Sequence, residues 1–168
     1  SLCTDSNHYI EILNQYEKFE HYAAINDITV FEGYCNTQKG KAFALYADYM
    51  LRCNDIDRYE EYLKKAEDYL LQAKQIYEKW GNSYGVFRAE LLSILVHMMQ
   101  YKKRTELVCI NPDTYRNRYS TLLLKLTEKY NSEQQFLREY DIIEYLQHNI
   151  SRMDIPLRIL KFYPIILQ

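Results

Sequence analysis

The sequence predicts an all-α domain built from antiparallel helix pairs, with six to eight helices in all. Through almost the whole chain, apolar residues recur at the three- and four-residue spacing of one helix face. Only 4 Gly and 3 Pro occur in 168 residues, which is too few for a β domain, whose turns recur about every 8–12 residues. The 48% of hydrophobic and 26% of charged residues are typical of a folded chain. We therefore expect residues 1–168 to form a single helical domain.

Capping residues place the ends of several helices. Asp57 followed by Glu60 is similar to a capping box, and Gly81-Asn82 ends one helix and begins the next. Asn111-Pro112-Asp113 combines a cap, a proline at the first helical position and an acid near the positive helix end. The expected helices span residues 6–25, 38–53, 58–80, 83–101, 112–130 and 132–151, with a short one after residue 154.

Three stretches interrupt this pattern. Residues 28–40 stay open between a short helix and a loop, because Gly33 and Gly40 weaken a helix. A loop is expected from Lys102 to Asn111, and Pro164 is expected to end the last helix. The remaining connections are about 2–6 residues long, which makes neighbouring helices antiparallel. Helix starts near residues 38, 83 and 132 give a repeat spacing that is typical of stacked helix pairs.

The residues from Ala44 to Leu92 carry a resemblance to a known family. The first helix supplies Ala47 and Tyr49-Met50, the second supplies Ala66-x3-Leu70-x2-Ala73, and a junction follows. That junction is Tyr77-Glu78-Lys79-Trp80-Gly81-Asn82 with Gly85-x2-Arg88-Ala89. This pattern resembles divergent tetratricopeptide-like repeats (TPR-like), of the kind attached to bacterial signalling ATPases and peptide-sensing regulators.

The resemblance implies a short right-handed solenoid, best matched over residues 38–102, with a further helix pair and a short terminal helix in 103–168. It also implies a scaffold that presents a concave groove to a protein or peptide segment, as part of a larger cytoplasmic regulator. It implies no reaction and no cofactor.

Tyrosine is abundant, with 18 residues against 6 Phe and one Trp. Tyr46, Tyr49, Tyr59 and Tyr62 recur at helical spacing, and we expect them to form the binding face together with Arg88 from the junction. The competing interpretation of each single tyrosine is packing at the edge of the core, with its hydroxyl reaching solvent.

Basic residues gather near residues 101–119 with tyrosines between them. The expected patch for an acidic partner consists of Lys102, Lys103, Arg104, Arg116 and Arg118. Cations interleaved with aromatic rings can bind single-stranded nucleic acid, so a nucleic-acid-binding adaptor is the alternative function. A net charge of −2 and a pI of about 6.1 count against it, and cations at a helix end also complement the helix dipole.

No catalytic pattern emerges. The four histidines are scattered, the four cysteines show no CxxC spacing, and no phosphate-binding glycine loop occurs. We expect no metal, no cofactor and no enzyme activity, with the cysteines reduced in the cytoplasm. A mature secreted or periplasmic domain is the alternative, since the chain opens on Ser1. No apolar stretch is long enough to insert into a membrane, and homodimerisation stays open.

Overall fold

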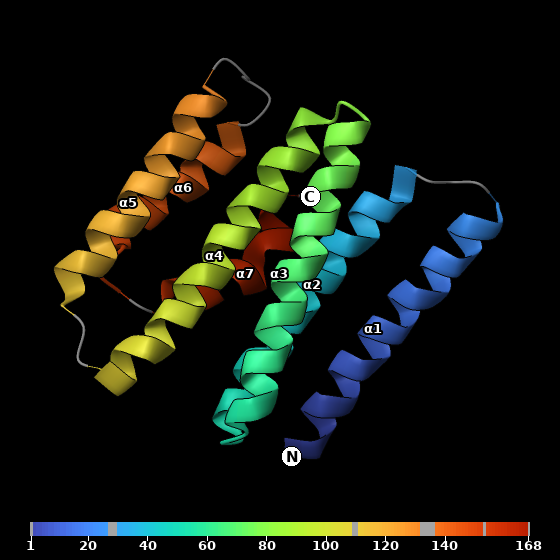
Figure 1. The fold of residues 1–168 in the computed structure, drawn as a ribbon, viewed down its shortest axis with the longest axis horizontal. Coiled ribbons are helices and arrows are strands. Elements are labelled where there is room, and N and C mark those ends of the chain that lie inside the picture. The colour runs from blue at the N-terminus through green and yellow to red at the C-terminus, as the bar shows by residue number, and fades with distance from the viewer. Residues whose placement is uncertain (1, 27–29, 109–110, 132–136, 153, 168) are drawn as a thin grey trace. The chain divides into compact units, whose positions relative to one another are not determined.

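The computed structural model describes the backbone of residues 2–26, 30–108, 111–131, 137–152 and 154–167, and the side chains of 7–26, 31–101, 111–131, 140–152 and 154–161. These residues form seven helices and no strand (Figure 1). The helices are α1 (Leu2–Ile25), α2 (Val30–Arg52), α3 (Ile56–Lys79), α4 (Ser83–Val108), α5 (Pro112–Lys129), α6 (Leu137–Asn149) and α7 (Ile155–Leu167). The all-α class and the expected number of helices are therefore confirmed for the described residues, whereas stacking as a right-handed solenoid stays a prediction.

The chain divides into two compact units, Ser1–Ala89 and Glu90–Gln168, and the boundary falls inside α4. Within the first unit, α1, α2 and α3 alternate in direction along the chain, and α2 packs against both of the others (Figure 1). Within the second unit, α5 packs against α6 and α6 against α7. Because contacts follow the order of the helices, each unit is built mainly from neighbours in sequence.

Glycines allow the helices of the first unit to approach closely. A Cβ atom on Gly40 of α2 would lie 2.7 Å from Leu70 Cγ of α3. Cβ atoms on Gly33 and Gly85 would lie 2.8 Å from Tyr77 Cε1 and 2.3 Å from Tyr77 Cδ1. The Tyr77 side chain of α3 therefore packs against backbone of both α2 and α4. This packing explains why residues 30–40, part of the stretch 28–40 that the sequence leaves open, belong to one continuous helix from Val30. Residues 28 and 29 lie outside the described residues.

Local capping follows the sequence with one shift. Asp55 caps α3 by accepting a hydrogen bond from Arg58 N–H at 3.1 Å, so Asp57 lies in the first turn and is not the cap. The shift arises because Asn54 takes a positive φ of 61° and turns the chain before Asp55. Gly81 at φ +66° follows α3, as the sequence predicts.

The next two helix starts agree with the expected caps. Asn82 accepts a hydrogen bond from Gly85 N–H at 2.9 Å, and Asn111 accepts one from Asp113 N–H at 2.9 Å. Pro112 occupies the first turn of α5, where its missing N–H costs nothing.

Two predicted helix ends are wrong. Helix α4 continues to Val108, although a loop is expected from Lys102. The segment between these residues contains no Gly or Pro and consists largely of good helix formers. Helix α7 continues through Pro164 to Leu167, because a proline this close to a helix end removes only one hydrogen bond of the ladder. The cap expected at 131–135 for the preceding helix lies largely outside the described residues.

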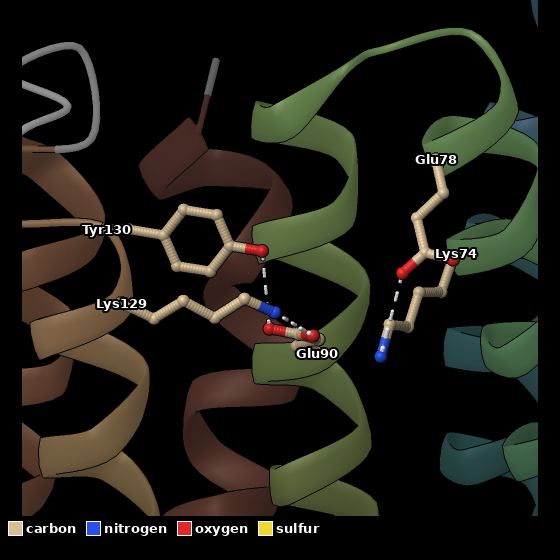
Figure 2. Close-up of polar contacts among 5 residues, drawn as sticks. All are labelled: Lys74, Glu78, Glu90, Lys129 and Tyr130. Atoms are coloured by element: carbon tan, nitrogen blue, oxygen red, sulfur yellow. Dashed lines mark hydrogen bonds and ion pairs between the residues drawn. The ribbon is translucent and has the colours of Figure 1, made fainter.

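The second unit contains a buried aromatic core and a polar junction. Tyr115 and Tyr119 of α5 are among its largest fully buried side chains, and the Tyr119 hydroxyl donates to the carbonyl of His97 on α4 at 3.0 Å. Figure 2 shows Glu90 of α4 accepting from Lys129 Nζ at 2.8 Å and from the Tyr130 hydroxyl at 3.4 Å. The Tyr140 hydroxyl donates in turn to the Tyr130 carbonyl. These bonds join α4, α5 and α6.

No helix within the described part of the chain is both long enough and apolar enough to cross a membrane.

Candidate functional site

The predicted tyrosine face lies inside the first unit. Tyr46, Tyr49 and Tyr59 are buried, and Tyr62 is half-buried. Tyr9 of α1 stacks on Tyr46 with ring centroids 5.3 Å apart, and Tyr62 of α3 stacks on Tyr46 at 4.6 Å. Helix α1 therefore covers this face, so these rings contribute to packing. A role for them in partner binding stays a prediction.

The predicted basic patch is only partly described. Arg116 and Arg118 are exposed on α5, while the side chains of Lys102, Lys103 and Arg104 lie outside the described ones. The Arg118 guanidinium lies 5.7 Å from the ring centroids of both Tyr101 and Tyr119. Tyr101 itself packs edge-on against Tyr119. The tyrosines of this patch are thus engaged with the protein's own core and with Arg118.

An unexpected run of buried polar residues lies on α2. Every residue from Cys35 to Ala42 is buried. The run contains the buried polar side chains Asn36, Thr37, Gln38, Lys39 and Lys41. Lysine is almost never fully buried unless it is paired, so the two lysines require an explanation.

Lys39 has its partners within the unit. Its ammonium group forms an ion pair with Glu20 of α1, and it lies 5.2 Å from the ring centroid of Tyr69 on α3. A carboxylate and an aromatic face thus compensate the burial of this charge.

Lys41 is different. Only 9% of its surface is exposed, and no described carboxylate forms an ion pair with it. Burial, together with the nearby positive charge of Arg88, lowers the pKa of Lys41 to about 8. The charged neighbour that shifts the pKa of Lys41 is therefore a second cation, Arg88.

Three helices bring these groups together. Gly33, Thr37 and Lys41 follow one another at four-residue steps on one face of α2. Gly85 and Arg88 lie three residues apart on α4. Because Tyr77 of α3 touches both Gly33 and Gly85, it fixes the two faces beside each other.

Tyrosine hydroxyls complete the arrangement. Burial raises the pKa of Tyr16 to about 12, with neighbouring Tyr34 acting in the same direction and Arg88 opposing. Burial also raises the pKa of Tyr77, against the opposing effects of a hydrogen bond with Thr37 and the charge of Arg88. Both hydroxyls are protonated at neutral pH and can donate hydrogen bonds.

We refer to Tyr16, Tyr34, Thr37, Lys41, Tyr77 and Arg88, all from the first unit, as the cationic cluster. It combines two cations with hydroxyl donors, a chemistry suited to an oxyanion. Sequence reasoning selected Arg88 of this set and missed Lys41, because a lysine in a polar run is normally interpreted as a surface residue. The available signal was the unbroken helical continuation of Asn36-Thr37-Gln38-Lys39 into an apolar segment.

Thiols and metal ligands offer no comparable arrangement. Burial, followed by the negative charge of Glu20, raises the pKa of the Cys35 thiol to about 11, which makes it a poor nucleophile. Cys53 is exposed. In the described part of the chain, no group of three or more His, Cys, Asp or Glu side chains is arranged to hold a metal ion.

The fold and this cluster define an all-α protein with a cationic group of side chains in its first unit. Comparison with family models, with curated proteins and with solved structures finds no match to this chain.

Proposed function

We propose that this protein is a non-catalytic module that binds a peptide or protein segment. The observation that carries the proposal is an exposed aromatic surface at the end of α1 and the start of α2. We call it the aromatic edge, and its members are Phe19, Tyr22, Ile25, Phe31 and Tyr34. Tyr22 and Ile25 are 59% and 71% exposed. Exposed apolar side chains that gather in one place indicate an interaction surface.

The aromatic edge is ordered by its own contacts. Phe19 and Phe31 meet edge to face with centroids 5.6 Å apart, and this pair joins α1 to α2. Rigid aromatic side chains lose little conformational entropy on binding, so they make effective anchors for apolar groups of a partner.

The aromatic edge adjoins the cationic cluster through Tyr34, which belongs to both. Tyr34 is exposed and meets the ring of Tyr16 edge-on at 6.5 Å. A segment with an apolar side chain and a nearby acidic group would suit both surfaces. This combination supports peptide recognition over a reaction.

Selection of peptides from a random library against the whole chain tests the proposal. We expect peptides with aromatic or aliphatic residues to be enriched by the wild-type protein and to bind Tyr22→Lys/Ile25→Lys at least about tenfold more weakly. The matched control is Leu124→Lys, which changes an exposed apolar residue of the second unit and should leave binding unchanged. Equal binding to all three proteins, or no enrichment at all, would contradict the proposal.

A nucleic-acid-binding adaptor is the second candidate. It is supported by exposed Arg116 and by Arg118 above two tyrosine rings. Binding of single-stranded RNA that weakens steeply with salt, and weakens further in Arg116→Ala/Arg118→Ala, would favour this function.

A further inference from the structure

We propose that Lys41 and Arg88 hold a small oxyanion, a carboxylate or a phosphate, within the first unit. The inference rests on the proposed function and names the chemical group through which the bound segment is held. Nothing else in the described part of the molecule combines a buried and a half-buried cation from two helices with hydroxyl donors from two others.

The geometry comes from helix packing. The Tyr77 ring fixes the Gly33 face of α2 against the Gly85 face of α4. Two turns along α2 from Gly33 lies Lys41, and one turn along α4 from Gly85 lies Arg88. The hydroxyl of Thr37, between Gly33 and Lys41, donates to the Gly33 carbonyl at 2.8 Å. As a neutral group it does not compensate the charge of Lys41.

The energetic argument concerns Lys41. A buried cation is costly unless an anion pairs with it. Lys41 is more than nine-tenths buried, and its charged neighbour is also a cation. Such an arrangement lowers stability and is retained where function requires it. An oxyanion between the two side chains would replace repulsion with two attractive interactions.

The neutral and charged groups of this region come from helices α1, α2, α3 and α4. Helix α1 supplies Tyr16, α2 supplies Tyr34 and Cys35, α3 supplies Tyr77, and α4 supplies Arg88. The carboxylate of Glu20, whose negative charge raises the pKa of Cys35, is paired with Lys39. Tyrosine and cysteine remain neutral here at neutral pH because burial raises the pKa of Tyr16, Tyr77 and Cys35.

Arginine and lysine suit an oxyanion in complementary ways. The planar guanidinium can donate two parallel hydrogen bonds, and the ammonium group acts as a compact charge. Because Lys41 is buried, its ligand must be a slender group such as a side chain or a chain end, and not a duplex backbone. We therefore assign the oxyanion to the peptide segment, as a carboxylate or as a phosphate ester.

The anion should bind more weakly as the pH rises through 8. Lys41 loses its proton near this value in the absence of an anion. Neutral Lys41 no longer attracts an anion, so the apparent affinity falls above this pH.

The experiment is thermal unfolding of the whole chain in sodium acetate, sodium phosphate or sodium chloride at constant ionic strength. We expect acetate or phosphate to raise the Tm of the wild-type protein above its value in chloride at pH 7, and the rise to vanish by pH 9.5. The more effective anion distinguishes a carboxylate from a phosphate ligand. In Lys41→Met the apparent dissociation constant of the more effective anion should increase at least about tenfold. Lys65→Met, at an exposed lysine, should behave as wild type.

Three results would overturn the inference. They are an equal anion response in wild type and Lys41→Met, a response that persists unchanged at pH 9.5, and no response to either anion. Should Lys41→Met fail to fold, the side-chain NMR signals of Lys41 in the wild-type protein decide, since acetate or phosphate must shift them. The probes carry no apolar part, so their response is independent of the aromatic edge. Peptide binding that depends on Tyr22 and Ile25 but not on Lys41 would retain the proposed function and exclude the anion site.

Discussion

The ring of Tyr77 lies so close to Gly85 that a Cβ atom at residue 85 would be 2.3 Å from Tyr77 Cδ1. On α2, Gly33 has the same relationship to this ring, with a distance of 2.8 Å to Cε1. The ring therefore acts as a spacer between two helix backbones. The same packing positions Lys41 and Arg88.

We predict that Gly85→Ala lowers the free energy of unfolding by up to about 2 kcal/mol. The clash should cost about 1–3 kcal/mol, and the better helix propensity of alanine should return about 1 kcal/mol. Urea unfolding measures the change. In a Tyr77→Leu background the ring is absent, so the same substitution should become neutral or stabilising. A loss of equal size in both backgrounds would show that the ring is not the cause.

Tyr115 and Tyr119 should respond oppositely to the loss of their hydroxyls. The Tyr115 hydroxyl is buried and has no hydrogen-bond partner among the described residues, whereas the Tyr119 hydroxyl donates to the His97 carbonyl. We expect Tyr115→Phe to stabilise the protein by about 1 kcal/mol and Tyr119→Phe to destabilise it by about 1 kcal/mol. Differential scanning calorimetry of the pair measures both. A loss of stability in both variants would contradict the hydrogen bonding described for the second unit.

Variants of Glu90 and Glu78 give a second matched comparison. Glu90 is largely buried and accepts from Lys129 and Tyr130, whereas Glu78 is exposed and lies 3.8 Å from Lys74 on its own helix (Figure 2). We predict that Glu90→Gln costs about 1 kcal/mol, because solvent screens the exposed Lys129, and that Glu78→Gln costs at most about 0.3 kcal/mol. Chemical unfolding of both variants tests this, and equal effects would contradict it.

Cysteine labelling tests the burial of α2. In a Cys3→Ser/Cys109→Ser background, exposed Cys53 should react with a disulfide reagent at pH 8, and Cys35 should react at least about a hundredfold more slowly. The reason is that Cys35 is buried and its pKa is raised to about 11. Both thiols should react at similar rates in denaturant. Similar rates in the folded protein would show that Cys35 is not buried.

The sequence indicates local features well and tertiary ones poorly. Asn82, Asn111 and Gly81 act within one or two turns of their own position, so their capping roles follow from residue type. Gly33 lowers the helix propensity of its segment, and only the approach of Tyr77 shows why the helix includes it.

The candidate site illustrates the same limit. Tyr46, Tyr49 and Tyr59 share helical spacing whether or not another helix covers them, and the cover by α1 is a long-range packing event. The local sign of burial at Lys41 is weak, since α2 combines polar and apolar residues all round its surface. Arg88 was accessible to sequence reasoning only through the family resemblance.

Lys41 also links the proposed site to stability. Its pKa is about 8 in the folded chain and 10.5 in its ordinary state. Between these values the unfolded chain binds a proton that the folded chain lacks, so the contribution of Lys41 makes the free energy of unfolding rise with pH. Below pH 8 both states are protonated and the penalty is constant. We predict that Lys41→Met is more stable than wild type by about 1–3 kcal/mol at pH 7, and that the difference shrinks above pH 8.

The most direct measurement is the pKa of Lys41 itself. It is obtained from an NMR titration of the wild-type protein labelled with ¹³C at the lysine Cε, with and without sodium acetate or sodium phosphate. We predict a pKa of about 8 without the anion, and an upward shift when acetate or phosphate binds, because an anion favours the charged ammonium. An ordinary lysine pKa, or a lowered pKa that neither anion changes, would contradict an oxyanion site at Lys41 and Arg88.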